Sequence, residues 1–431
     1  MLGLLAKLVG GFSFALIYTY YYSYGGDTKN YFHDASILVN LFVDSPRAYI
    51  EVLLSDPAGI LKDYHEIASK LKYHLGTSEW FTVKVNSLAT IIGMRSYFAS
   101  TLVVAGVTYI GVWKLFQVLY RRYPNAHRSL AFAVLFVPSV FFWGSGLMKD
   151  SIVIGLLGYV IYLADQFNRR GILKGGITMV FMVICSYIIF QIKAYVLISL
   201  IPAILIWIIL SYRERMENVV IRKLLFPFLM VISIGAIGYA IQWLGSYTTK
   251  YNMDTVFDTA ESMQTWHYIE GENVSEKHGR GSSYSLGEYD PSFAGTMVMF
   301  IPAINVTFFR PYLWEVKNIA MLAAAVESTI IFLYSLFIFL GLGFFRVLKI
   351  LNRDSFLLMS LSFALFFGFA VGFTSYNFGA LVRYKIPCIP FYLSSLFILQ
   401  YKVREMKSKD RYYRLQARKL GNAAYSEPNV G

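Results

Sequence analysis

The chain has 431 residues, of which 56% are hydrophobic, 17% aromatic and only 15% charged. This composition excludes a water-soluble globule of this size, because too little polar surface is present to cover one. The formal net charge of +13 does not indicate a nucleic-acid partner, since the basic residues gather between apolar runs and at the C-terminus, which is a signal of membrane topology. The two cysteines, Cys185 and Cys388, both lie in apolar segments and indicate neither a disulfide framework nor a metal site.

The apolar segments are mostly long enough to cross the membrane, since about 30 Å of hydrocarbon takes roughly 20 helical residues. The sequence therefore predicts an all-α, polytopic membrane protein with about ten transmembrane helices. The first helix is expected from about Leu4 to Tyr24, and it lacks a small-residue cleavage pattern, so it is expected to be retained. The others are expected at Tyr97–Tyr120, Leu130–Trp143, Ile152–Phe167, Gly176–Ile192, Tyr195–Tyr212, Leu225–Leu244, Ile319–Phe345, Phe356–Thr374 and Pro387–Tyr401.

A polar region, 25–95, separates the first two spans and forms the first external loop. Within it, Ala35–Leu54 and Ala58–Leu75 carry apolar residues at helical spacing, and Asp56-Pro57 separates them. They are expected to be amphipathic helices lying along the membrane surface. A second external loop is expected at 245–317, and its apolar stretch Phe293–Phe309 is interpreted as a re-entrant or interfacial segment, because Gly, Pro and Asn weaken it as a span.

The basic clusters predict the orientation of the chain. With a cytoplasmic N-terminus, all of them fall on the cytoplasmic side, as the bias of Lys and Arg in short loops requires. The expected organisation is a single transmembrane domain, 1–401, in the inner membrane, followed by a basic cytoplasmic tail, 402–431, held on anionic lipid headgroups. The clusters are Arg121, Arg122 and Arg128; Arg169, Arg170 and Lys174; Arg213, Arg215, Arg222 and Lys223; Arg346, Lys349 and Arg353; and the tail.

Two carboxylates follow the first helix, in the stretch Tyr24–Asp34. Gly25 and Gly26 allow a sharp turn, which would hold Asp27 at the membrane edge as a candidate general base, with Asp34 as a second candidate. Tyr31 and His33 are possible supporting residues. The alternative is that Gly-Gly-Asp-Thr only ends one helix and caps the next.

Four cations lie in short external connections, against the positive-inside bias, and are interpreted as donor phosphate-binding residues: Lys149, Lys193, Arg310 and Arg383. Each one alone could contact lipid headgroups or a nearby acid, as Lys149 could pair with Asp150. Converging on one face, they predict a site for an anionic ligand, and a phosphate in a membrane points to a lipid carrier. Asp150, Tyr312 and Tyr384 are possible supporting residues, and Glu327, about nine residues into a helix, is expected to form a structural pair rather than to act in catalysis.

No HExxH, paired CxxC, P-loop or dinucleotide-binding motif is present in the sequence. No cofactor is therefore indicated with certainty. A divalent metal is possible if Asp27, Asp34 and Asp150 approach one another.

The layout resembles the GT-C superfamily of polytopic glycosyltransferases, which use sugars linked to polyprenyl or dolichyl phosphate. The resemblance lies in an acid just after helix one, amphipathic helices in the first external loop, and a large late external loop. It implies that Asp27 acts as general base on an acceptor hydroxyl, on a glycan or lipid, with inversion at the anomeric carbon. It also implies that the cations stabilise the leaving lipid phosphate. The single Gly-Gly-Asp departs from the paired acidic motif of the family's oligosaccharyltransferases. Within this resemblance, the segments around Lys149, Arg310 and Arg383 are similar to uncharacterised envelope proteins of Bacteroidetes-type bacteria.

Two other interpretations remain open. The opening Gly25–Tyr31 also resembles that of Wzy-type polysaccharide polymerases or ligases, which bind lipid diphosphate. A transporter, flippase or non-catalytic assembly protein is the third possibility. Transporters tend to place ionisable groups at the midplane and to carry internal repeats, whereas the polar groups here gather at the outer ends of the helices.

Overall fold

The computed structural model describes residues 1–22, 26–171, 175–215, 265, 269, 282–287 and 293–424. The regular secondary structure of these segments is helical apart from one isolated bridge between Ser283, in the non-helical segment 282–287, and Asn377. The predicted span Leu225–Leu244 lies outside the described residues, as does most of 245–292, the first part of the predicted loop 245–317.

Helices α2 to α6 form a compact unit with its own hydrophobic core, which also takes in residues of α1 (Leu2–Tyr20) and of the chain before α10. Three N-caps separate these short helices: Ser45, Asp56 and Thr77 accept hydrogen bonds from the amides of Ala48, Gly59 and Trp80. The predicted helix Ala35–Leu54 is thus divided at Ser45, because Pro46 starts a new helix there. The bounds are α2 Gly26–Asp44, α3 Pro46–Leu54, α4 Pro57–Asp63, α5 His65–Lys70 and α6 Ser78–Ile92.

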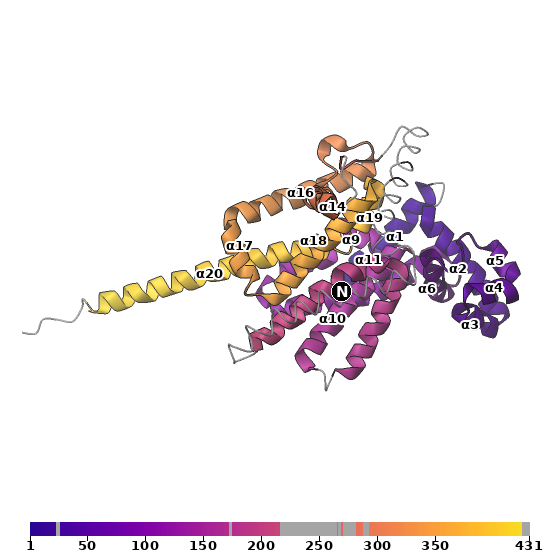
Figure 1. The fold of residues 1–431 in the computed structure, drawn as a ribbon, viewed down its shortest axis with the longest axis horizontal. Helices are drawn as coiled ribbons and strands as arrows, with labels where there is room; N and C mark the ends of the chain where they lie inside the picture. The colour runs from indigo at the N-terminus through magenta and orange to yellow at the C-terminus, as the bar shows by residue number, and fades with distance from the viewer. Residues whose placement is uncertain are drawn as a thin grey trace, which may run out of the picture.

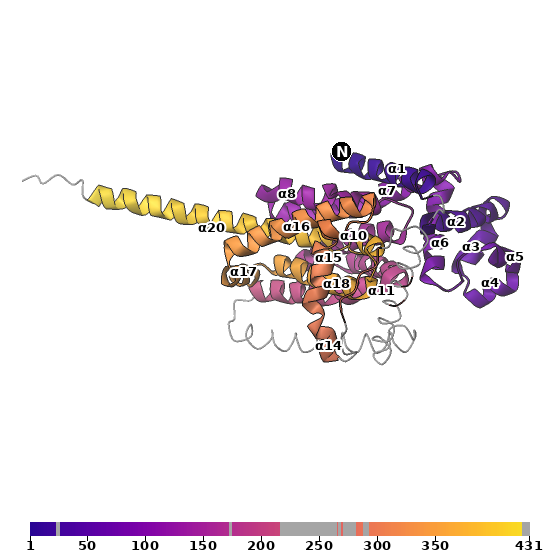
Figure 2. The ribbon, with the colours of Figure 1, turned by 90° about the horizontal axis from the view of Figure 1, so that it is seen from above.

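The long apolar helices form the bundle that carries the main core. In it α7 packs against α1 and α10, α10 against α11, and α11 against α18, which also contacts α15 and α20. Figure 2 shows α1 lying along α7 at the edge of the bundle. The bounds are α7 Tyr97–Arg122, α10 Lys149–Arg170, α11 Gly176–Arg215, α15 Phe300–Phe309, α16 Ile319–Leu342, α18 Ser355–Ser375 and α20 Ile389–Ala424.

Among the described residues, six helices are long and apolar enough to cross a membrane: α1, α7, α10, α11, α16 and α18. A seventh is added if α19 (Phe378–Tyr384) and α20, which meet at a bend of 65°, count as one broken span. The structure thus confirms an all-helical chain with several apolar helices of spanning length, but not the predicted count of ten.

The predicted span Leu130–Trp143 is broken. It consists of α8 (His127–Ala131), a π-helical turn (Phe132–Phe136) and α9 (Pro138–Trp143). The break lies at Val137, whose extended backbone is the conformation that a following proline imposes. Pro138 also lacks the amide that would continue the preceding helix.

The two predicted spans Gly176–Ile192 and Tyr195–Tyr212 are joined in the single helix α11, which has non-helical backbone angles at Lys193. Figure 1 shows the two arms of α11 meeting at an angle. Each arm is close to the roughly 20 residues that a span takes, whereas a straight helix of the full length would be about twice too long. The break therefore leaves the backbone around Lys193 at one end of the bundle.

The segment interpreted as re-entrant, Phe293–Phe309, forms α14 (Phe293–Val298) and α15, which packs against α18. After α16, Gly343 adopts a positive φ of 75°, and the short amphipathic helix α17 (Phe344–Leu351) follows. The predicted span Ile319–Phe345 thus ends earlier than expected. The predicted tail is largely the continuation of α20.

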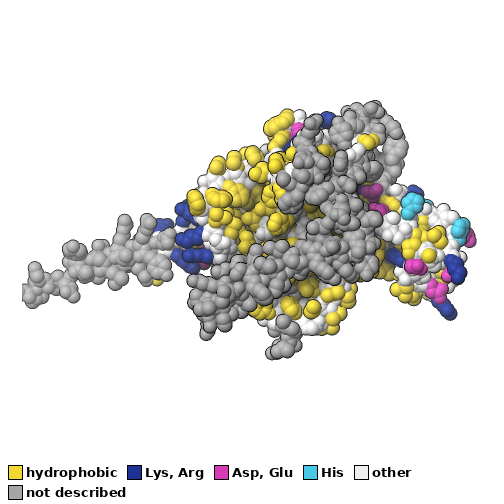
Figure 3. Space-filling view, in the orientation of Figure 1, with side chains coloured by type: hydrophobic (Ala, Val, Ile, Leu, Met, Phe, Trp, Pro, Cys, Tyr) yellow, Lys and Arg dark blue, Asp and Glu magenta, His cyan; other side chains and the backbone are white. Residues whose placement is uncertain are grey.

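The bundle has two distinct ends. Figure 1 shows α2–α6 at one end, here named the site end, and the free length of α20 projecting from the other, the opposite end. Figure 3 shows Lys and Arg side chains gathered near the base of α20, beside a broad apolar surface. At the opposite end Tyr123, after α7, donates a hydrogen bond of 2.7 Å to Asp354, before α18, and Lys402 of α20 lies 3.2 Å from the same carboxylate.

Candidate functional site

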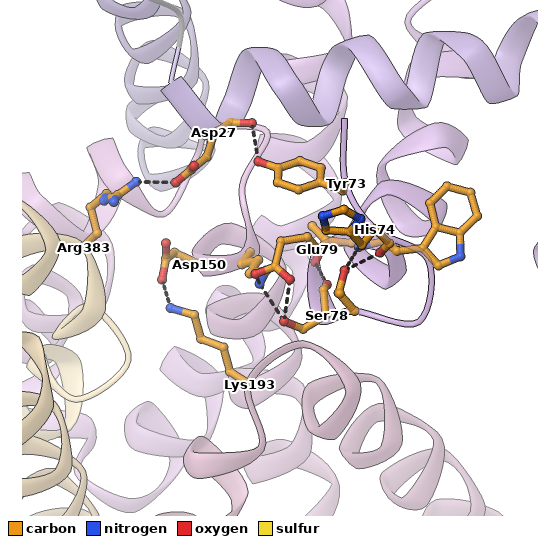
Figure 4. A network of polar contacts seen from close by, with 12 residues as sticks. Asp27, Tyr73, His74, Ser78, Glu79, Asp150, Lys193 and Arg383 are labelled. Carbon is orange, nitrogen blue, oxygen red and sulfur yellow. Dashed lines mark hydrogen bonds and ion pairs between the residues drawn. The ribbon is translucent and has the colours of Figure 1, made fainter. Parts of the chain in front are cut away.

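Five helices bring charged side chains together at the site end. The ion-pair cluster contains three carboxylates and three cations, each carboxylate paired with one cation, and Figure 4 shows most of its members facing one another. Because each cation is paired with a carboxylate, an anionic ligand that binds one of the three cations must displace a carboxylate. Its members are Asp27 of α2, Glu79 of α6, Lys149 and Asp150 of α10, Lys193 of α11 and Arg383 of α19.

Asp27 lies in the first turn of α2, where the helix dipole favours a negative charge. Gly26 begins the helix with a positive φ of 53°, and an added Cβ there would lie 3.0 Å from the ring of Tyr18. The Asp27 side chain is 53% exposed, and its Oδ2 lies 3.3 Å from Nη1 of Arg383. Asp27 is therefore the most accessible acid of the cluster.

Asp150 and Lys193 form a buried ion pair, with side chains 4% and 6% exposed. Asp150 lies in the first turn of α10, and Lys193 is the residue at which α11 breaks. The Lys193 ammonium also lies 4.4 Å from the centre of the Tyr384 ring, and Asp150 is close enough to Arg383 to interact with it electrostatically. The pair thus connects α10 and α11 to the part of α19 that faces Asp27.

Lys149 connects α10 to the N-terminus of α6. Its ammonium lies 2.5 Å from the Glu79 carboxylate and 2.8 Å from the Ser78 hydroxyl. Burial acts to raise the pKa of Glu79, but the Lys149 ammonium and the hydrogen bonds to the carboxylate outweigh it and hold that pKa below its ordinary value. Glu79 is thus ionised at neutral pH and anchors α6 to the bundle.

Tyrosines border the cluster on the side of α2. Tyr31 and Tyr73 stack with ring centres 4.9 Å apart, and the Tyr73 hydroxyl donates to the backbone carbonyl of Asp27 at 3.4 Å. Burial raises the pKa of both phenols, so both remain protonated donors at neutral pH. Both rings lie close enough to Asp27 to interact with its charge.

Asp34 lies two turns after Asp27 on α2, but its carboxylate is fully buried. It accepts hydrogen bonds from the amide of Lys72 at 3.0 and 3.1 Å and from the amide of Tyr73 at 3.0 Å. His33, about half exposed, places its Nδ1 at 2.9 Å from the same carboxylate. These contacts make Asp34 an anchor for the segment that carries Tyr73, and they leave it no access to a substrate hydroxyl.

Arg310 lies apart from the ion-pair cluster. Its Nε lies 3.0 and 3.1 Å from the two carboxylate oxygens of Glu315, and its guanidinium lies 5.2 to 5.8 Å from the ring centres of Tyr284, Tyr312 and Phe378. Tyr312 also exchanges hydrogen bonds with Asn305 at 2.9 and 3.1 Å. The structure thus brings together three of the four predicted phosphate-binding cations and places Arg310 in a separate aromatic setting.

Glu327 and a buried lysine hold the short helix α9 from both ends. The Glu327 carboxylate accepts hydrogen bonds from the amide and the hydroxyl of Ser139, at 2.9 and 2.5 Å, at the N-terminus of α9. The Lys7 ammonium, buried within the bundle, donates to the carbonyl of Gly144 at the C-terminus. A negative charge at the start and a positive charge at the end both match the helix dipole. Glu327 therefore orients the segment that leads to Lys149 and Asp150.

Within the described part of the chain, no group of three or more His, Cys, Asp or Glu side chains is arranged to hold a metal ion. Sequence reasoning missed Glu79, Tyr73 and Lys7. A signal for Glu79 was present, since Thr77-Ser78-Glu79 before an apolar run is typical of a helix start.

Comparison of the chain with protein-family models, with curated proteins and with solved structures finds no match. The fold defines an all-helical protein with several apolar helices of membrane-spanning length. The unit of α2–α6 lies at one end of the bundle, and the ion-pair cluster lies where this unit meets the bundle. The resemblance to the GT-C superfamily remains an expectation.

Proposed function

We propose that this protein is a membrane glycosyltransferase that moves a sugar from a polyprenyl-phosphate-linked donor to a glycan or lipid acceptor. The observation that carries the proposal is the pairing of an accessible carboxylate, Asp27, with a guanidinium, Arg383, next to two further cations. Apolar helices of membrane-spanning length with a charged cluster at one end of the bundle suit a lipid-linked donor.

In this proposal the donor phosphate takes the place of the Asp27 carboxylate on Arg383. Guanidinium groups bind phosphate oxygens with two parallel hydrogen bonds, and Lys149 and Lys193 add positive charge nearby. Displacement frees Asp27 to accept a proton. The phosphate thereby prepares the base for the reaction.

The reaction then proceeds by a single displacement. Asp27 takes the proton of the acceptor hydroxyl as its oxygen bonds to the anomeric carbon, and the bond from that carbon to the phosphate oxygen breaks with its electron pair. Polyprenyl phosphate leaves, and Arg383 stabilises its added charge. Attack opposite the leaving group inverts the anomeric centre.

We place the protein in the inner (cytoplasmic) membrane, with both termini cytoplasmic and the ion-pair cluster on the periplasmic face. The support is that the described basic segments lie at the opposite end, away from Asp27: Arg121 and Arg122 at the end of α7, Arg169 at the end of α10, α17 between α16 and α18, and the start of the free length of α20.

The test is a gel of envelope glycans and glycolipids from cells with wild type, a deletion, Asp27→Asn, or Asp63→Asn. Asp63 is an exposed carboxylate on α4, so its variant is the matched control and is expected to behave as wild type. A discrete mobility shift in both the deletion and Asp27→Asn supports the proposal. Loss of a repeating ladder in both would instead support a Wzy-like polymerase or ligase, and an effect of the deletion alone would remove Asp27 from the chemistry.

A further inference from the structure

An excess of positive charge surrounds one aromatic ring near the opposite end of α7 and α10. The Lys114 ammonium lies 4.5 Å, and the Arg121 guanidinium carbon 5.2 Å, from the centre of the Tyr162 ring. Within the described ranges, no carboxylate lies within ion-pair distance of Lys114. Arg121 shares a single buried carboxylate, Asp165, with two more arginines, so three arginines face one acid while Lys114 lies at the Tyr162 ring.

Arg121 is the least tightly held of the three arginines on Asp165. Its nearest nitrogen lies 3.4 Å from the carboxylate, whereas those of Arg122 and Arg169 lie at 2.7 and 3.0 Å. Its side chain is also 37% exposed. Arg121 can therefore bind another anion while Asp165 keeps its other two partners.

The same face of α7 is open along the apolar part of the helix. Val107 and Ile110 are 59% and 52% exposed, and Lys114 and Arg121 follow on that face, because steps of three, four and seven residues return to one side of a helix. Lys114 and Arg121 are about 10 Å apart along the helix axis. Their charged groups nevertheless meet at the Tyr162 ring, so one phosphate can contact both, and the exposed Val107 and Ile110 lie one to two turns earlier on the same face. A phospholipid therefore fits both the cations and this apolar face, whereas a small soluble anion would contact the cations alone.

We propose that Lys114, Arg121 and the Tyr162 ring form a binding site for the phosphate of a membrane phospholipid in the leaflet at the opposite end. The acyl chain lies over Val107 and Ile110, Arg121 donates to the phosphate oxygens, and the long stem of Lys114 lets its ammonium reach the same headgroup. Arg169, 48% exposed, adds charge beside it. This site is independent of the proposed glycosyl transfer.

The test uses the purified full chain in zwitterionic detergent micelles, titrated with phosphatidylglycerol, with phosphatidylcholine or with inorganic phosphate. Bound lipid is counted by native mass spectrometry. We expect phosphatidylglycerol to bind wild type in preference to phosphatidylcholine, Lys114→Gln to weaken that binding about fivefold, as expected for one cation near the headgroup, and Lys114→Arg to retain it. Lys349→Gln, an exposed lysine of α17 at the same end, is the matched control and should bind as wild type.

Equal binding by wild type and Lys114→Gln would overturn the site, as would an equal loss in Lys349→Gln, which would mean a diffuse surface charge. If inorganic phosphate occupied the site and competed fully with the lipid at millimolar concentration, the ligand would be a soluble anion and the assignment to a phospholipid would be wrong. If Lys114→Gln failed to fold, Arg121→Gln would carry the test, because Arg122 and Arg169 still neutralise Asp165 in that variant.

Discussion

Nη1 of Arg383 lies 3.3 Å from Oδ2 of Asp27, although 356 positions separate the two residues along the chain. The contact joins the first turn of α2 to the short helix α19, and no other pair in the ion-pair cluster includes so accessible a carboxylate. An anion that reaches Arg383 must therefore compete with Asp27. This competition makes Arg383 the residue whose loss should affect a phosphate ligand most directly.

We expect Arg383→Ala to weaken binding of polyprenyl phosphate to the purified protein by roughly 10- to 100-fold, the effect of losing hydrogen bonds between charged groups. Arg310→Ala should change it little, because Glu315 already occupies that guanidinium. Binding of a radiolabelled polyprenyl phosphate measures both. Equal losses in the two variants would place Arg310 in the phosphate site and contradict the separation seen here.

Asp34→Ala should destabilise the unit of α2–α6 by roughly 2–4 kcal/mol, because it leaves the buried amides of Lys72 and Tyr73 without their charged acceptor. The midpoint of thermal unfolding in detergent measures the loss, and Asp63→Ala is the exposed control. Activity should fall with stability and recover at low temperature. An Asp34→Ala variant of wild-type stability but without activity would restore Asp34 as a catalytic candidate.

The existence of the long helices could be predicted because an apolar run that crosses a membrane must satisfy its own backbone hydrogen bonds, which a helix does. Their interruptions could be predicted only in part. One predicted span ends at Ile192 and the next begins at Tyr195, and the backbone breaks between them at Lys193, whereas the break before Pro138 falls inside one predicted span. A charged residue marks the first break in the sequence, but the second lies in a stretch that is otherwise apolar.

The candidate site could be predicted where its cations depart from the bias of Lys and Arg toward cytoplasmic loops. Lys149, Lys193 and Arg383 stood out as cations outside the basic clusters, and the structure brings these three together. Arg310 also lies outside the basic clusters, but it forms an ion pair with Glu315, five residues away, and not with the other three cations' partners. The burial of Asp34 leaves no trace in the sequence, because its partners are mainly backbone amides, which every residue carries.

Glu327→Ala should cost roughly 2–4 kcal/mol of stability, since two hydrogen bonds to a charged group are lost at the start of α9. Glu327→Gln should cost less, because its amide oxygen can still accept from Ser139. Lys7→Met removes the contact at the other end of α9. The stability lost in the double variant, Lys7→Met with Glu327→Gln, should differ by about 0.5–3 kcal/mol from the sum of the losses in the two single variants, since both residues contact the same helix. Strictly additive effects on the unfolding midpoint would mean that the two ends of α9 respond independently.

Gly111→Ala should destabilise the contact of α7 with α10 by about 1–3 kcal/mol, because the added methyl group would overlap the backbone of Gly155, which in turn lies against Thr108. Gly106→Ala is the control on the same helix, since nothing lies within 4 Å of a Cβ at that position. It should be neutral, or stabilising by up to about 1 kcal/mol from helix propensity. Similar unfolding midpoints for the two variants would show that α7 and α10 can separate without cost.

The ion pair of Glu79 with Lys149 should make the anchoring of α6 sensitive to acid. The pKa of Glu79 is lowered in the folded protein, so the carboxylate stabilises the fold above its unfolded pKa of about 4.3, and this stability is lost as the pH falls through the folded value. Between about pH 6 and about pH 3.5, we therefore expect the unfolding midpoint of wild type to fall further than that of Glu79→Gln. Glu66→Gln, which breaks an exposed pair with Lys70, should keep the wild-type response. If Glu79→Gln and wild type lose the same stability on acidification, Lys149 does not depend on Glu79 for its place in the cluster.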